Sequence, residues 1–136
     1  MSTPADPIAL IIDDDADTLL LVGEIVRIAG YRAVMTDNFD AAVAYVAQEP
    51  KVILLDVVMP NALCDRLVAH LAQRASMVPV LLMSSMGALE LEQKRRELVS
   101  AGVNAPTVLQ KPFWVDALLS ALAEALPSGA ADHALE

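Results

Sequence analysis

The chain has a single cysteine and only five aromatic residues among its 136 residues. One thiol excludes a disulfide within the chain and excludes a metal site built from several cysteines. Hydrophobic residues make up 56% of the sequence but aromatic ones only 4%, so the core must consist mainly of aliphatic side chains. The length is that of one ordinary domain with little room for a second.

Basic residues and long apolar runs are also scarce. Nine Lys and Arg residues against eighteen Asp and Glu residues give a formal charge of -9 at pH 7. Such a balance repels nucleic-acid phosphates and anionic membranes. No apolar run approaches the roughly 20 residues that span a bilayer, and the first residues lack the cationic and apolar parts of a signal peptide. We therefore expect a soluble, cytoplasmic domain that binds neither nucleic acid nor membranes.

Short apolar runs alternate with longer amphipathic segments between two expected tails, residues 1–7 and 127–136. Continuous β-branched runs are typical of strands that are buried on both faces. Strands are expected at 8–12, 31–36, 52–55, 79–83 and 107–110, and helices at 16–29, 39–48, 63–74, 88–101 and 115–126. Five strand-then-helix units predict an α/β domain over residues 8–126, with a parallel sheet that carries helices on both faces.

Polar residues that could form a site follow four of the five expected strands, whereas Thr36-Asp37-Asn38 after the second is expected to be a helix cap. Ligands of an open parallel α/β sheet bind beyond the carboxyl ends of its strands. The residues in question are Asp13, Asp14 and Asp15 after the first strand, Asp56 after the third, Ser84 and Ser85 after the fourth, and Lys111 and Pro112 after the fifth. Crowded carboxylates repel one another, and Mg²⁺ removes that conflict. Together with an ammonium and a hydroxyl, these carboxylates suit a site in which one carboxylate carries a phosphoryl group. The spacing of the residues does not say which carboxylate this is.

These segments, in this order, resemble the receiver domain of bacterial two-component response regulators over residues 7–126. The matching motifs are Ile11–Asp15, Val52–Pro60, Leu82–Ser85 and Gln110–Phe113. The resemblance implies a flavodoxin-like, doubly wound (βα)5 fold with strand order 2-1-3-4-5. It also implies that Asp56 is the phosphoacceptor.

The resemblance assigns roles to the remaining site residues as well. A Mg²⁺ or Mn²⁺ ion would be held by Asp13, Asp14, Asp56 and the backbone carbonyl of Val58, with Asp13 acting largely through water. Lys111 would contact the phosphoryl group and Ser84 would be the switch hydroxyl. Met59, Pro60, Ser85 and Pro112 would shape the site, with Pro112 in a cis peptide bond.

The same resemblance implies a signalling phosphoacceptor rather than an enzyme with turnover. A sensor histidine kinase or a phosphotransfer protein would supply the phosphoryl group. The face formed by the fourth helix, the fifth strand and the fifth helix would then change its downstream partner. Homodimerisation through this face is left open.

Three features depart from the family pattern. Val108 stands where the family commonly has an aromatic switch residue in the fifth strand, so an aromatic ring cannot report the state of the site. The usual glycine after the Met59-Pro60 step is absent, which predicts a differently shaped loop at Asn61-Ala62. The stretch from Ser84 to Lys111 is about five residues longer than the family pattern leads us to expect, which predicts an unusual partner surface.

Other interpretations of these residues stay open. Asp15 or Asp17 could be a helix cap alone, and Asp13 and Asp14, taken without the other site residues, could be caps as well. A receiver-like module whose partner binding ignores phosphorylation is the alternative function. A Mg²⁺-dependent phosphatase is a third, but Val57-Val58 offers no second acid near Asp56. Trp114 is expected to pack into the core, and the run 94–96 is expected to be a solvated helix face.

Overall fold

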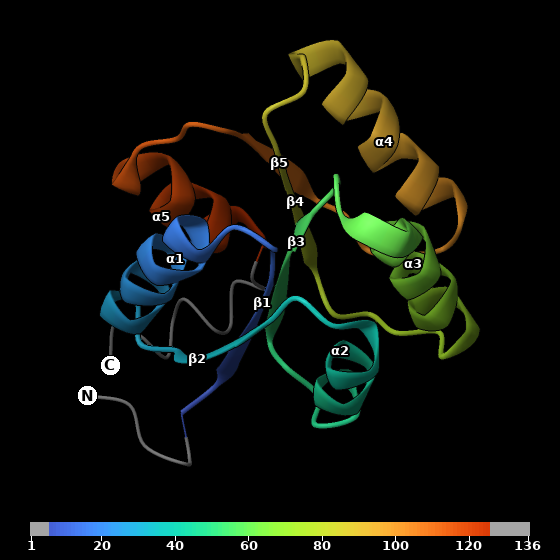
Figure 1. Ribbon diagram of the computed structural model, residues 1–136, viewed down its shortest axis with the longest axis horizontal. Coiled ribbons are helices and arrows are strands. Elements are labelled where there is room, and N and C mark those ends of the chain that lie inside the picture. Colours follow the sequence, from blue (N-terminus) through green and yellow to red (C-terminus); the bar gives the residue numbers. More distant parts are fainter. Residues whose placement is uncertain (1–5, 126–136) are drawn as a thin grey trace.

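The computed structural model describes residues 6–125, which form a parallel five-stranded sheet with helices on both faces (Figure 1). In chain order the elements are β1 (Ile8–Ile12), α1 (Ala16–Ile28), β2 (Arg32–Thr36), α2 (Phe39–Val46), β3 (Val52–Asp56), the 3-10 turn η1 (Pro60–Ala62), α3 (Leu63–Gln73), β4 (Val80–Ser84), α4 (Ala88–Ser100), β5 (Thr107–Gln110) and α5 (Val115–Ala125). The strand order is β2-β1-β3-β4-β5, and each neighbouring pair is parallel. The expected doubly wound fold and its strand order are therefore confirmed.

Alternate side chains of each strand enter two separate cores. One face of the sheet packs against α2, α3 and α4, and the other packs against α1 and α5 (Figure 1). Leu10, Ile53 and Leu82 point to the first face, whereas Ile11 and Leu54 point to the second. Because side chains alternate along a strand, a continuous apolar run is what a strand covered on both faces requires.

Burial along the sheet separates central from edge strands. Every residue of β3 and β4 is buried, whereas every residue of β2 is only half-buried and β5 ends on the exposed Gln110. The edge strands have one strand neighbour instead of two, so their side chains are covered less completely.

Local sequence signals set the ends of the helices. Asp15 caps α1 by accepting a hydrogen bond from the Thr18 backbone N–H, and Asn38 caps α2 in the same way. Gly30 and Gly102 follow α1 and α4 with φ of 98° and 92°, a left-handed backbone that glycine adopts without steric cost. The expected stops at these two glycines are confirmed.

Some expectations fall outside the described residues or are corrected by the structure. The predicted tails lie mostly at 1–5 and 126–136, which the structure does not describe, so they stay predictions. Trp114 does not pack into the core but is 85% exposed. This position falls in the turn before α5 rather than on its buried stripe. No helix within residues 6–125 is long and apolar enough to cross a membrane.

Candidate functional site

The carboxyl ends of β1, β3 and β4 bring the predicted site residues to one edge of the sheet. Asp56 ends β3 and pairs in register with Met83, one residue before Ser84 at the end of β4. Asp13 follows β1 directly. Lys111 follows β5, and its backbone N–H donates to the Ser84 carbonyl at 2.7 Å. Parallel pairing therefore gathers side chains that lie up to 98 residues apart in the sequence.

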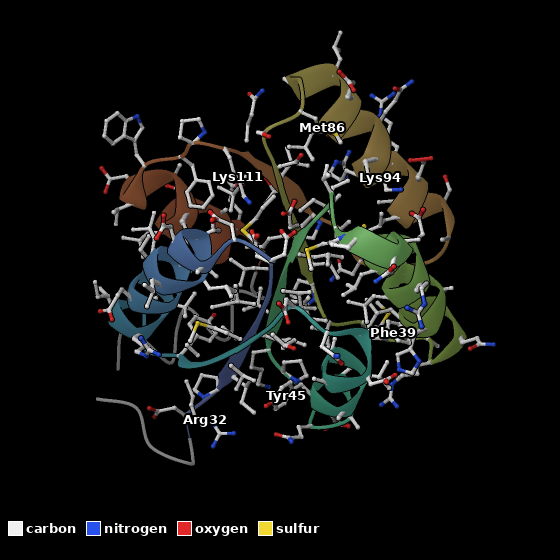
Figure 2. All side chains as sticks on the ribbon, viewed as in Figure 1. Arg32, Phe39, Tyr45, Met86, Lys94 and Lys111 are labelled. Carbon is white, nitrogen blue, oxygen red and sulfur yellow. The ribbon has the colours of Figure 1, made fainter. Side chains whose placement is uncertain are left out.

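Lys111 lies between two buried carboxylates (Figure 2). Its Nζ is 2.7 Å from Oδ2 of Asp13 and 3.4 Å from Oδ2 of Asp56. Asp13 is fully buried, and its other oxygen accepts the Asp15 backbone N–H at 2.9 Å. The second oxygen of Asp56 accepts the Val58 backbone N–H at 3.1 Å. One ammonium thus compensates two carboxylates that have left bulk water.

Asp14 adds a third carboxylate, which is exposed to solvent. Oxygens of Asp13, Asp14 and Asp56 lie within 4.8 Å of one another. Three carboxylates against one ammonium leave the cluster negative, and its donors are all oxygen, which is what Mg²⁺ and Mn²⁺ prefer. The donor chemistry therefore fits the predicted hard divalent cation. Asp15 does not join the cluster but serves as the cap of α1. Of the three consecutive acids that follow β1, the cap interpretation therefore holds for Asp15 and not for Asp13 or Asp14.

Burial dominates the electrostatics of Asp56. Desolvation raises the pKa of its carboxyl to about 6, with the nearby Asp13 charge acting in the same direction. The Val58 N–H and the Lys111 ammonium oppose this shift. Burial would lower the pKa of Lys111, but its hydrogen bond to Asp13 and the charge of Asp56 more than offset this, so the pKa is raised. Lys111 is therefore a permanent cation at neutral pH, whereas the pKa of the Asp56 carboxyl lies close to neutral pH.

Ser84 is buried at the end of β4, and its Oγ accepts the Met86 backbone N–H at 3.1 Å. Ser85 beside it is exposed. The Lys111–Pro112 peptide bond is cis, as predicted. Met59 and Pro60 lie between Asp56 and α3, with Pro60 opening the turn η1.

The family model of the response regulator receiver domain matches residues 9–123. The chain belongs to the response regulator receiver family. No curated protein sequence gives a significant match.

Solved receiver structures share this fold. The chemotaxis protein CheY4 of Vibrio cholerae matches with a TM-score of 0.76 at 25% sequence identity, covering 90% of this chain and 100% of that one. The signal receiver domain of a protein from Vibrio parahaemolyticus, described as a Luxo repressor, matches with a TM-score of 0.77 at 21% sequence identity. The match covers 96% of this chain and 97% of that one. NtrX from Brucella abortus gives 0.74 at 22% identity, covering 94% of this chain but 29% of that chain.

The loop that follows β3 of this receiver domain is shaped without glycine. Asn61 and Ala62 both have left-handed backbones, with φ of 60° and 53°. Asparagine tolerates this conformation, but alanine pays a steric cost because of its Cβ. The predicted effect of the missing glycine is thus seen as a strained turn immediately before α3.

Sequence reasoning missed the polar contacts that hold α4. Within the run 94–96, Lys94 pairs with Asp65 of α3 at 2.6 Å (Figure 2), and Arg95 donates to the Ala105 carbonyl at 3.0 Å. The prediction of a solvated face is therefore wrong for these two residues and holds for the exposed Arg96. Gln110 was also missed: its Nε2 donates to the Met86 carbonyl at 3.0 Å. No local pattern encodes contacts between residues so distant in sequence.

Proposed function

We propose that this receiver domain accepts a phosphoryl group on Asp56 and changes its protein partner in response. The position of Lys111 carries this proposal. Its ammonium touches both Asp13 and Asp56, and Asp14 stands within reach of the same oxygens. An ammonium that is shared between two buried carboxylates can move toward the one that gains negative charge and stabilise that charge.

The phosphoryl donor would be a phosphohistidine of a sensor histidine kinase or a phosphotransfer protein. A carboxylate oxygen of Asp56 forms a bond to phosphorus while the phosphorus–nitrogen bond breaks, and its electron pair stays on the imidazole. Lys111 stabilises the charge that gathers on the phosphoryl oxygens. The reaction modifies the domain itself, so its function is signalling and not turnover of a substrate.

The acidic cluster would hold Mg²⁺ or Mn²⁺ through Asp14, Asp56 and the Val58 carbonyl. Asp13 is fully buried and accepts the shorter of the two Lys111 hydrogen bonds, 2.7 Å against 3.4 Å for Asp56, which favours a role through water for Asp13. When bound, the ion neutralises charge on the phosphoryl oxygens. The exposed Asp14 leaves the cluster open to solvent, from which the ion can enter.

The output would come from the face made of α4, β5 and α5, after Ser84 turns toward the phosphoryl group. Two large apolar side chains stand out from this face: Leu89 is 86% exposed and Trp114 is 85% exposed. A groove of about 310 Å³ lies between β5 and α5, with Val108 and Trp114 among its lining residues. A downstream protein, or a second copy of this domain, would bind here in the cytoplasm.

The first test is intact mass spectrometry after incubation with Mg²⁺ and acetyl phosphate. We expect one phosphoryl group on the wild type and none on Asp56→Asn, nor on the wild type with EDTA. Asp37→Asn is the matched control, because Asp37 is an exposed acid that follows β2, which β1 separates from β3 in the sheet. Phosphorylation of Asp56→Asn, or none of the wild type, would exclude Asp56 as the acceptor.

A second candidate function is a partner-binding module that ignores phosphorylation. Val108 favours it, because an aliphatic side chain cannot act as an aromatic switch. Beryllofluoride with Mg²⁺, a stable mimic of the phosphoryl group, separates the two functions. Equal recovery of partners by wild type and Asp56→Asn in its presence would support the module, and a difference would support the phosphorylation switch.

A further inference from the structure

The side of β5 that faces α4 carries two residues, Val108 and Gln110. Side chains alternate along a strand, and Val108 packs into the core formed with α2, α3 and α4, whereas Leu109 packs into the opposite core. Val108 has no polar group. Any polar link from this side of β5 to the start of α4 therefore falls to Gln110.

Met86 is held on both sides by different strands. Its backbone N–H donates to Oγ of Ser84 at 3.1 Å, and its carbonyl accepts Nε2 of Gln110 at 3.0 Å. These groups belong to successive peptide units, so Ser84 fixes the unit before Met86 and Gln110 fixes the unit after it. The residue lies at the entry to α4 (Figure 2).

The helix that follows Met86 is lightly anchored. Of the 13 residues of α4, only Leu91 and Leu98 are buried. Its N-cap is Gly87, which has no side chain that could cap the helix. Leu91 near the start of α4 is fully buried and the Met86 side chain packs against the same core, so the two backbone contacts of Met86 act together with this packing to fix where the first turn lies. Leu89 in that turn projects into solvent.

We propose that Gln110 is the positioning residue that couples Ser84 to the partner face, in the role that an aromatic residue of this strand has elsewhere in the family. This inference rests on the proposed function. When the Ser84 hydroxyl turns to a phosphoryl oxygen, the Met86 N–H loses its acceptor and the peptide before it is free to rotate. Gln110 still holds the Met86 carbonyl, so the movement is passed to β5 and to the segment 111–114 that follows it.

The test compares variants of Gln110 by nuclear magnetic resonance with Mg²⁺ and beryllofluoride. Amide signals of Val57 and Val58 report occupancy of Asp56. The indole N–H signal of Trp114, the one tryptophan of the chain, reports the partner face. Gln110→Met keeps an unbranched chain but lacks the donor, and Gln110→Lys restores an N–H donor. Asn104→Leu is the matched control. The Asn104 side-chain amide also donates to a backbone carbonyl, that of Met77, with the same 3.0 Å hydrogen-bond length, but this hydrogen bond lies outside the site.

We expect occupancy to saturate in all three variants. The Trp114 shift should fall by about two- to tenfold in Gln110→Met, the factor that one ordinary hydrogen bond supplies. In Gln110→Lys and Asn104→Leu it should remain near the wild-type shift. An undiminished shift in Gln110→Met at full occupancy would overturn the coupling role and leave the phosphoacceptor function intact. An equal loss in Asn104→Leu would also overturn it. Absence of occupancy in the wild type would instead reject both.

Discussion

At the scale of single residues, the site is a balance of charges in a partly dry environment. Lys111 is the cation that two buried carboxylates share, and Asp13 has no exposed surface at all. Removing the shared cation is costly, because it leaves both carboxylates buried without compensation. Sequence reasoning identified every member of this group, because each one ends or follows an apolar run.

Lys111→Met tests this balance directly. We expect a loss of about 2–3 kcal/mol in the free energy of unfolding at pH 7, because Asp13 and Asp56 lose their shared cation. Urea denaturation measures it. Lys51→Met is the control, since Lys51 is exposed, and it should change stability by about 0.5 kcal/mol or less. Equal stability of the two variants would contradict the charge balance.

At the scale of elements, the loop before α3 and the helix α4 differ in what holds them. The loop places Asn61 and Ala62 in left-handed conformations that the fold imposes on them. The helix has few buried side chains and depends on contacts made by Lys94 and Arg95. Both segments flank the site, the loop after β3 and the helix after β4.

Ala62→Gly should stabilise the domain. Removing the Cβ at φ 53° relieves about 1–2 kcal/mol of steric cost, and the added freedom of the unfolded chain takes back part of it. We expect a net gain of about 0.5–1 kcal/mol in thermal or urea unfolding. Ala101→Gly, at an exposed residue with φ -80°, should lower stability instead. A loss from Ala62→Gly would show that the turn is not strained.

Leu98→Ala should loosen α4 specifically. Leu98 is one of its two buried residues, and truncation of a buried leucine costs about 2–4 kcal/mol. Hydrogen exchange of the amides in α4 should accelerate more than exchange in β3. Leu89→Ala, at an 86% exposed position of the same helix, should leave both rates unchanged. Uniform acceleration across the sheet would mean that α4 does not open on its own.

At the scale of the whole molecule, the raised pKa of Asp56 makes stability depend on pH. The pKa is about 6 in the folded protein against 3.8 for an unperturbed carboxyl. Between these values the folded state holds a proton that the unfolded state has lost, so stability falls as pH rises. The full loss of folding free energy from ionising the buried Asp56 carboxyl applies above pH 6.

Asp56→Asn should therefore be more stable than the wild type at pH 7 in metal-free buffer. We expect a gain of about 1–2 kcal/mol at pH 7 that becomes smaller as the pH falls toward 4, because the unfolded-state carboxyl, with a pKa of 3.8, then also takes up its proton. Urea denaturation from pH 4 to pH 8 measures it, with Asp37→Asn as the control. A gain that does not change with pH would assign the effect to packing rather than to ionisation.

Local features of the sequence predicted the alternation of strands and helices, the helix stops at Gly30 and Gly102, and the residues that meet at the sheet edge. These follow from local causes: apolar periodicity, permissive glycine backbone and the polar residues that end apolar runs. Its resemblance to receiver domains supplied the strand order, which periodicity leaves open.

Which of these polar residues touch, and how the elements around them are held, became clear from the packing of the folded domain. It gave Asp15 to the cap of α1 and placed Asp14 with Asp13 and Asp56. It also exposed Trp114 and joined Gln110 to the Met86 carbonyl. The physical reason is that these contacts connect residues distant in sequence, so their geometry depends on how strands and helices pack and on no local pattern.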